Sequence, residues 1–367
     1  MTDCLSVLKR EERATIALRS LYNSYGYLPF KMSKFEEYDL YVGNKDFLVS
    51  DRVITFNDTD GRLLALKPDV TLSIVKNTAD GEGTVEKVYY NENVYRVSGA
   101  TGQFKEIMQA GIECIGDLSE SDVFEVVYLA AKSLEVVSRD FVLDVSHMGI
   151  LSAIIESASD SDLFKKEIFA LIAEKNAHEA VAVCRRYGVS AENTEIIRAL
   201  PSVYGNMLDV LERLRPLCKS ESALRAYGEL ESLAGFLSST EFADRIRFDF
   251  SVVNNMNYYN GIVFRGFLSG ICEGVLSGGE YDKLLSGMGR DSGAIGFALY
   301  LDQLSELDSE TSGYDVDVLL IYSDEVSAKD VADKKREIIA SGRSVSTQRA
   351  VPEKLRYREK IVMGGDK

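Results

Sequence analysis

Acidic and amide side chains are interleaved with segments of the sequence that otherwise have the character of strands. Gln109 and Glu113 stand four positions apart in such a segment, FKEIMQAGIECIG, so both side chains point to the same face of a strand. Carboxylates such as those of Asp69 and Glu113 can hold an ammonium group or accept a hydrogen bond from an imidazole N–H. These residue types suit the binding of a small polar molecule, although Glu113 taken alone is better explained as a charge at a strand edge.

The sequence lacks the common signatures of catalysis and of metal binding. It contains no GxxxxGK(S/T) phosphate loop, GxSxG elbow, HExxH or GxGxxG motif. Of its two histidines, His147 lies at an element boundary, where a structural role is the more common one, and His178 lies in a polar helical segment. The five cysteines are scattered without a CxxC pair, which fits reduced thiols in a cytosolic protein. We therefore expect no metal and no other cofactor.

The overall charge argues against polyanionic partners. The 367 residues include 58 acidic and 42 basic side chains, which gives a formal net charge of −16. Nucleic-acid affinity depends largely on Lys and Arg side chains that neutralise phosphates, so no nucleic-acid partner is expected. The charged N-terminal segment has no apolar signal core, and no apolar run is long enough to cross a membrane. We expect a soluble, cytoplasmic protein without membrane contacts.

The first part of the chain predicts an alternation of helices and antiparallel strands. The apolar spacing indicates a helix over residues 8–25, and a hairpin over residues 53–69 follows with Asp60-Gly61 as its turn. A short helix is expected from residue 72, after the Pro68-Asp69 break. Residues 85–97 and 104–116 then read as two strands around a glycine-containing loop. Ser119 and Asp122 resemble a capping box and predict the start of a long helix.

The remaining segments predict a helical insert, the second half of a sheet and a small second domain. Residues 149–243 are helical in character, and strand signals return at 246–253, 258–267 and 272–276. Residues 294–304 are expected to form the last helix of the core. We predict an α+β core over residues 1–308, a polar linker, and a small α/β domain over residues 313–367.

Several blocks of sequence resemble the histidyl-tRNA synthetases, which have the class II synthetase fold. The first half contributes LLALKPDVT (residues 63–71), VYRVSG (94–99) and QAGIECIG (109–116). The second half contributes MNYYNGIVF (256–264), SGGEYDKLL (277–285) and AIGFALYLDQL (294–304). The resemblance covers residues 5–306 and, in weaker form, the tail, which is similar to a shortened anticodon-binding domain. It implies an antiparallel class II sheet with a helical insert.

This resemblance implies a pocket for histidine. Its expected members fall at the family positions that contact the amino acid or its imidazole, except for Arg96, which falls at the arginine that contacts the α-phosphate. We expect the following residues to bind histidine: Asp69, Thr71, Arg96, Gln109, Glu113, Tyr258 and Tyr259.

The positions that handle ATP in the family depart from its pattern. Asn254, Glu280 and Gln303 stand where the synthetases have arginine, and Ser98 stands where they have an acid. Gln103 and Lys105 occupy the arginine positions of the loop between the two long strands. Each missing charged contact to a transition state costs on the order of 3 kcal/mol, or about a hundredfold in rate. We therefore expect no amino-acid activation by this chain.

The spelling NNMNYYNGIVFRG with SGGEYDKLL and AIGFALYLD resembles the family of ATP phosphoribosyltransferase regulatory subunits. That resemblance implies a non-catalytic subunit that joins the short catalytic subunit in a hetero-octamer, in the first step of histidine biosynthesis, with histidine as inhibitor. It also implies a homodimeric core joined through residues 26–35, which include Pro29. Two alternatives are a divergent histidyl-tRNA synthetase and a histidine-sensing protein with another partner.

Overall fold

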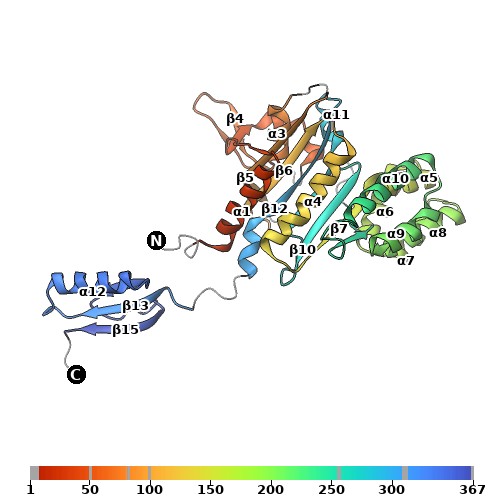
Figure 1. The fold of residues 1–367 in the computed structure, drawn as a ribbon. Helices are drawn as coiled ribbons and strands as arrows, with labels where there is room; N and C mark the ends of the chain where they lie inside the picture. The colour runs from red at the N-terminus through yellow and green to blue at the C-terminus, as the bar shows by residue number, and fades with distance from the viewer. Residues whose placement is uncertain are drawn as a thin grey trace. The chain divides into compact units, whose positions relative to one another are not determined.

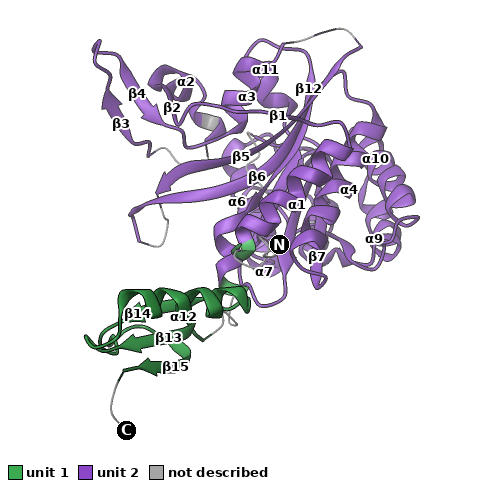
Figure 2. Cartoon of the chain, turned by 60° about the vertical axis from the view of Figure 1, so that its left-hand side comes forward, with its two compact units in different colours: residues 1–10, 306–367 green, residues 11–305 purple. Residues whose placement is uncertain are grey.

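The computed structural model describes residues 8–48, 52–79, 81, 83–97, 101–253, 258–307 and 313–364. The chain divides into two compact units, one of residues 11–305 and one in which residues 306–367 group with residues 1–10 (Figure 2). None of the helices in the described ranges is long and apolar enough to cross a membrane.

A nine-stranded sheet forms the centre of the larger unit (Figure 1). Neighbouring strands are antiparallel except in the pairs β1–β5 and β7–β9, which are parallel. In spatial order the strands are β1 (Leu28–Pro29), β5 (Val85–Val97), β6 (Phe104–Gly116), β12 (Gly293–Tyr300), β11 (Leu276–Glu280), β10 (Ile262–Leu268), β7 (Phe141–His147), β9 (Ile246–Asp249) and β8 (Tyr204–Gly205). This is the α+β, class II-like architecture predicted from the sequence.

One face of the sheet is covered by two long helices, α1 (Arg10–Ser24) and α4 (Glu120–Val137). The predicted capping box is confirmed at the start of α4, where Ser119 N donates to the Asp122 carboxylate at 3.0 Å. Tyr22 of α1 is fully buried, and its hydroxyl is 3.0 Å from Ser133 Oγ of α4. This buried hydrogen bond joins the two helices, and the Tyr22 ring packs beside Tyr89 of β5 and Phe297 of β12.

The opposite face carries a small three-stranded sheet and three short helices. The small sheet has the order β2 (Phe35–Glu37), β4 (Leu63–Leu66), β3 (Thr55–Asn57), and β3 and β4 form the predicted hairpin. Gly61 in its turn has a φ of +89°, a conformation that favours glycine. The short helices on this face are α2 (Tyr38–Val42), α3 (Thr71–Asn77) and α11 (Asp282–Gly287).

A group of helices occupies the chain between β7 and β9, where the sequence predicts the helical insert. Its helices are α5 (Met148–Ala158), α6 (Asp162–Ala173), α7 (Ala177–Arg186), α8 (Ala191–Ala199), α9 (Met207–Leu214) and α10 (Glu221–Leu237). Side-chain oxygens of Ser161, Ser190, Asn206 and Ser220 cap four of them by accepting from backbone N–H groups of the first turn.

The prediction of a helix over residues 294–304 is wrong. Residues Gly293–Tyr300 form β12, which pairs with β6 and β11 near the middle of the sheet, and only Leu301–Leu307 turn as a 3₁₀ helix. A short apolar run buried on both faces has no clear period, so its sequence does not distinguish a central strand from a helix.

The smaller unit is a three-stranded parallel sheet with one described helix. The strand order is β14 (Val345–Gln348), β13 (Val316–Tyr322), β15 (Tyr357–Met363), and α12 (Ala328–Ala340) connects β13 to β14. Its small core contains Val318, Leu320 and Ile338. Strands and a helix are the elements of the α/β class predicted for the tail.

Candidate functional site

A cavity of about 380 Å³ opens over the large sheet, and all seven residues expected to bind histidine line it. We call it the sheet cavity. Its complete lining is Phe47, Leu48, Asp69, Val70, Thr71, Tyr90, Arg96, Gln109, Glu113, Tyr258, Tyr259, Arg265, Gly274, Ser277, Tyr281, Gly296, Phe297, Ala298 and Tyr300. The expected residues come from four separate stretches of sequence, which the strand pairing and α3 bring together.

Small residues in register form the floor of the cavity. Ala298 and Ser277, which both line the cavity, pair with each other across β12 and β11, and Gly111 of β6 pairs with Ala298 on its other side. A Cβ on Gly296 would collide with the Glu113 carboxylate, so the glycine leaves the space that this side chain occupies. The larger side chains of the lining stand around this floor as walls.

Glu113 is the buried carboxyl group at the centre of the hydrogen bonds in the cavity. It is 2% exposed, and its two carboxylate oxygens accept from Thr71 Oγ1 at 2.8 Å and from the Tyr281 hydroxyl at 2.6 Å. Burial raises the pKa of Glu113 to about 8, although the bonds from Tyr281 and Thr71 oppose this shift. Near neutral pH the carboxyl is therefore mostly protonated, and it would release this proton to solvent when a ligand donates a hydrogen bond to it.

Asp69 and Arg96 form an ion pair at the edge of the cavity. Asp69 Oδ1 accepts from Leu72 N at 3.0 Å, which satisfies a backbone donor in the first turn of α3. Arg96 Nη2 lies 3.5 Å from Asp69 Oδ2, and Arg96 Nε donates to the Pro68 carbonyl at 2.7 Å. Burial raises the pKa of Asp69, and the positive charge of Arg96 opposes that rise. The guanidinium of Arg96 is thus largely committed within the chain.

Gln109 carries an unused donor into the cavity. The residue is 2% exposed, and its Nε2 has no hydrogen-bond partner among the described residues. A buried donor without an acceptor costs about 1–3 kcal/mol, so a bound molecule with an acceptor would remove that cost. The position of Gln109, opposite Tyr300 in the β6–β12 pairing, places the donor at the wall of the cavity.

Aromatic side chains form the wall of the cavity beyond Glu113. The rings of Tyr258 and Tyr259 are 4.6 Å apart, and those of Tyr258 and Tyr281 are 5.6 Å apart. Burial raises the pKa values of Tyr258 and Tyr281 well above that of a free tyrosine, so their hydroxyls remain protonated donors. Such a wall can stack on a flat ring and donate hydrogen bonds to it.

Sequence reasoning missed several residues of the cavity. Tyr281 directly follows Glu280, the last residue of β11, and its place in the SGGEYD block was a signal for it. Arg265, Ser277 and Tyr300 also line the cavity, but only the pairing of β10, β11 and β12 reveals that they share one face.

The positions expected to handle ATP are dispersed. Gln303 lies in the 3₁₀ helix after β12 and is not part of the cavity lining, and Gln103 and Lys105 are exposed at the hairpin between β5 and β6. Asn254 and Ser98 fall outside the described residues.

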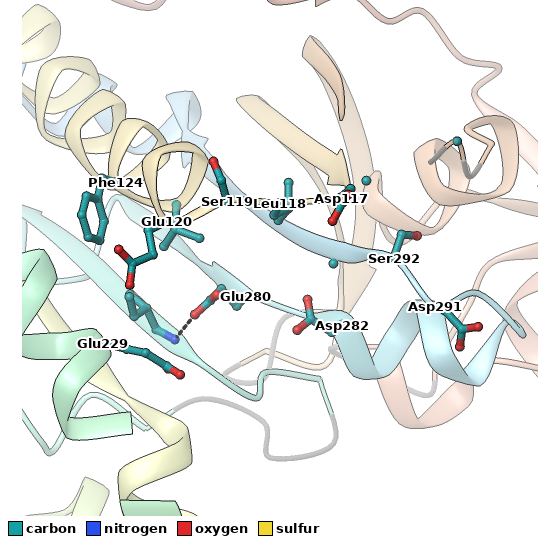
Figure 3. Close-up of a pocket in the computed structure, with 15 residues that line it drawn as sticks. Asp117, Leu118, Ser119, Glu120, Phe124, Glu229, Glu280, Asp282, Asp291 and Ser292 are labelled. Carbon is teal, nitrogen blue, oxygen red and sulfur yellow. Dashed lines mark hydrogen bonds between the residues drawn. The ribbon is translucent and has the colours of Figure 1, made fainter. Parts of the chain in front are cut away.

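Glu280, at the remaining arginine position, lines a different cavity, which has a volume of about 580 Å³ (Figure 3). Glu280 accepts a hydrogen bond from Ile262 N, and burial raises its pKa to about 7. The carboxylates lining this acidic cavity are Asp117, Glu120, Glu229, Glu280, Asp282 and Asp291. Such a lining disfavours phosphate, and no metal-binding group of three or more ligands occurs within the described ranges.

His147 has a structural position beside the acidic cavity. Its Nδ1 accepts from Gly149 N at 3.1 Å and caps α5, and its Nε2 lies 3.0 Å from Glu229 Oε2. Because Nδ1 accepts, the ring proton is on Nε2 and donates to Glu229. This agrees with the structural role expected for a histidine at an element boundary.

The sequence of this chain is similar to those of known proteins. The family model described as histidyl-tRNA synthetase matches residues 5–304. The chain is 31% identical, over 295 residues, to the ATP phosphoribosyltransferase regulatory subunit of Caldanaerobacter subterraneus, covering 78% of this chain and 75% of that protein. It is 29% identical over 293 residues to the regulatory subunit of Oceanobacillus iheyensis, covering 79% and 72% respectively.

Two solved structures share the fold. One is an ATP phosphoribosyltransferase regulatory subunit/histidyl-tRNA synthetase from Bacillus halodurans, with a TM-score of 0.76, 24% identity, and coverage of 98% of this chain and 95% of that chain. The other is a chain of the ATP phosphoribosyl transferase complex from Thermotoga maritima, with a TM-score of 0.61, 19% identity, and coverage of 78% and 96%.

Proposed function

Because the chain belongs to the histidyl-tRNA synthetase family, in its branch of ATP phosphoribosyltransferase regulatory subunits, we propose that it binds and activates a short ATP phosphoribosyltransferase catalytic subunit and makes that enzyme sensitive to histidine. The complex would carry out the first step of histidine biosynthesis, in the cytoplasm. The chain itself would contribute no catalytic group and would bind no cofactor.

The observation that carries the proposal is the composition of the sheet cavity. It combines a buried carboxylate that accepts hydrogen bonds, Glu113, with an unused amide donor, Gln109, and an aromatic wall beside them. A histidine molecule has a matching set of groups: an imidazole N–H for the carboxylate, a flat ring for the tyrosines, and oxygen acceptors for the amide. The seven residues predicted from sequence would together form this histidine site.

The same cavity is poorly equipped for ATP. Transfer of an adenylyl group needs positive charge where negative charge develops in the transition state. Arg96 is paired with Asp69, Gln303 is not part of the lining, and Glu280 places a carboxylate in another cavity. These placements support binding of the amino acid without its activation.

Inhibition would follow from a difference in affinity between two states of the complex. Histidine in the sheet cavity shifts the complex toward the state that binds it more tightly, and a site far from the catalytic subunit can act only through such a difference. A factor of 10 to 100 between the states corresponds to about 1.4 to 2.7 kcal/mol of coupling.

The proposal includes a dimer of this chain joined through residues 26–35. β1 within this segment is the two-residue edge strand of the large sheet, and Leu28 is 65% exposed. An exposed apolar side chain on an open strand edge is a suitable surface for a second copy. Assembly with the catalytic subunit into a hetero-octamer would build on this dimer.

The test is an assay of phosphoribosyl-ATP formation by the short catalytic subunit of the same organism, with and without this chain, followed by titration with histidine. We expect activation on mixing and progressive loss of that activation as histidine is added. A catalytic subunit that is indifferent to this chain would refute the proposal. Histidine-dependent exchange of pyrophosphate into ATP by the chain alone would instead identify it as a synthetase.

A further inference from the structure

Arg265 extends along the face of β10 that looks into the sheet cavity. The next residue, Gly266, faces the other way, because a Cβ on it would collide with Leu134 of α4. Arg265 pairs with Ser277 of β11 and lines the cavity with it. The Arg265 side chain runs over Gly274, where a Cβ would meet Cγ at 2.9 Å and Cδ at 3.1 Å. Glycine at 274 thus leaves the space in which this side chain lies.

Among the described residues, no acidic side chain forms an ion pair with Arg265. Its register partner on β7 is Asp144, yet the two form no ion pair, and the charges that act on Asp144 come from Asp249, Arg247 and Lys175. Its guanidinium carbon lies 5.6 Å from the centre of the Phe267 ring. Arg265 is exposed and lines the sheet cavity, so it presents to that cavity a positive charge without an ion-pair partner among the described residues.

The other charged side chains that line the cavity already have hydrogen-bond or ion-pair partners within the chain. Asp69 and Arg96 pair with each other, and Glu113 accepts hydrogen bonds from Thr71 and Tyr281. A zwitterionic amino acid whose ring and ammonium group lie near Glu113 and Asp69 has one remaining charge, its carboxylate. Among the described residues of the lining, Arg265 is the cation left to meet it.

We propose that Arg265 binds the α-carboxylate of the amino acid held in the sheet cavity, so that the site recognises both ends of its ligand. This inference rests on the proposed function, because it assigns one group of the same histidine site. Arginine suits the task, since its planar fork of N–H donors matches the two oxygens of a carboxylate. Selection against amines and alcohols that share the imidazole ring would then come from Arg265.

The experiment compares L-histidine with L-histidinol, which keeps the ring and the ammonium group but has a hydroxymethyl group in place of the carboxylate. Binding of both to the full chain is measured by calorimetry at pH 7 for the wild type and for Arg265→Met. We expect the variant to bind histidine at least tenfold more weakly, a loss of about 1.4 kcal/mol. Its affinity for histidinol should remain within twofold of the wild-type value.

Two further variants test whether a change in histidine affinity comes from the position of the Arg265 side chain. Gly274→Ala places a Cβ where the Arg265 side chain runs, so it should weaken histidine binding and leave histidinol binding unchanged. Arg139→Met removes an exposed arginine from the turn between α4 and β7, outside the cavity, and should affect neither ligand.

The possible outcomes distinguish a failure of the role of Arg265 from a failure of the histidine site itself. Equal histidine affinities of the wild type and Arg265→Met would overturn the role of Arg265 while leaving the histidine site in place. Equal weakening of histidine and histidinol would also overturn it, because the residue would then act through packing. If the wild type bound neither ligand, the proposed function would fail, and this inference with it.

Discussion

Replacement of Glu113 by glutamine tests the buried carboxylate on which the proposed site depends. Glutamine has nearly the same volume, but it cannot accept the hydrogen bonds of Thr71 and Tyr281 with two equivalent oxygens while also accepting one from a ligand. A hydrogen bond to a charged group contributes about 1.5–3 kcal/mol. We therefore expect Glu113→Gln to weaken histidine binding by roughly ten- to 150-fold.

The same substitution should stabilise the empty protein at high pH. Burial raises the pKa of Glu113 from 4.5 to about 8. Between these values the folded state keeps a proton that the unfolded state has lost, so the free energy of unfolding falls as pH rises through this window. Each pKa unit corresponds to about 1.4 kcal/mol, so the total reaches several kcal/mol above pH 8. Glutamine does not titrate, and its variant should not lose this stability.

Two measurements check these expectations. Calorimetric titration at pH 7 in buffers of different ionisation enthalpy should show that the wild type releases a proton on binding histidine, because Glu113 ionises to accept the imidazole N–H. Urea unfolding at pH 6 and pH 9 should show a larger loss of stability for the wild type than for Glu113→Gln. Glu135→Gln, an exposed change on α4, is the matched control. Unchanged histidine affinity in Glu113→Gln would refute the assignment of this residue to the site.

Three further predictions concern the nucleotide positions, the cavity floor and the α4 cap. Gln303→Arg alone should produce no pyrophosphate exchange, because residue 303 does not line the cavity; measurable exchange would show that one arginine at this position restores amino-acid activation. Gly296→Ala should abolish histidine binding, since its Cβ would collide with the Glu113 carboxylate. The control Gly228→Ala, in α10 with open space around the glycine, should instead raise the free energy of unfolding by about 0.5–1 kcal/mol, measured by thermal unfolding. Ser119→Ala should lower the stability of the larger unit by about 1 kcal/mol without changing the dissociation constant for histidine, and a change in that constant would contradict the separation of α4 from the site.

Local signals in the sequence were sufficient for most elements of the fold. The strands 85–97 and 104–116 were predicted with the bounds of β5 and β6, because long alternating segments separated by glycines have few other solutions. The start of α4 followed from the spacing of Ser119 and Asp122, whose interactions are confined to one helical turn. Such features depend on neighbours within a few residues, so the sequence specifies them directly.

The strand β12 was predicted wrongly because its character depends on distant neighbours. Five of its eight residues are buried, four of them in succession, so the segment shows no clear alternation. Only pairing with β6 on one side and β11 on the other makes it a strand. An isolated peptide of this composition has no such partners. The identity of a central strand is therefore decided when the sheet assembles.

The sequence by itself determined which residues were candidates for the histidine site, because family motifs mark Asp69, Gln109, Glu113 and the two tyrosines at recognisable positions. Only the tertiary structure decided that these residues share a cavity, that Tyr281 donates to Glu113, and that Arg265 looks into the same space. The physical reason is that cross-strand register and helix packing set the distances between residues far apart in the chain. Burial then sets the pKa of Glu113 and the cost of the unpaired Gln109 donor, and burial is a property of the folded chain alone.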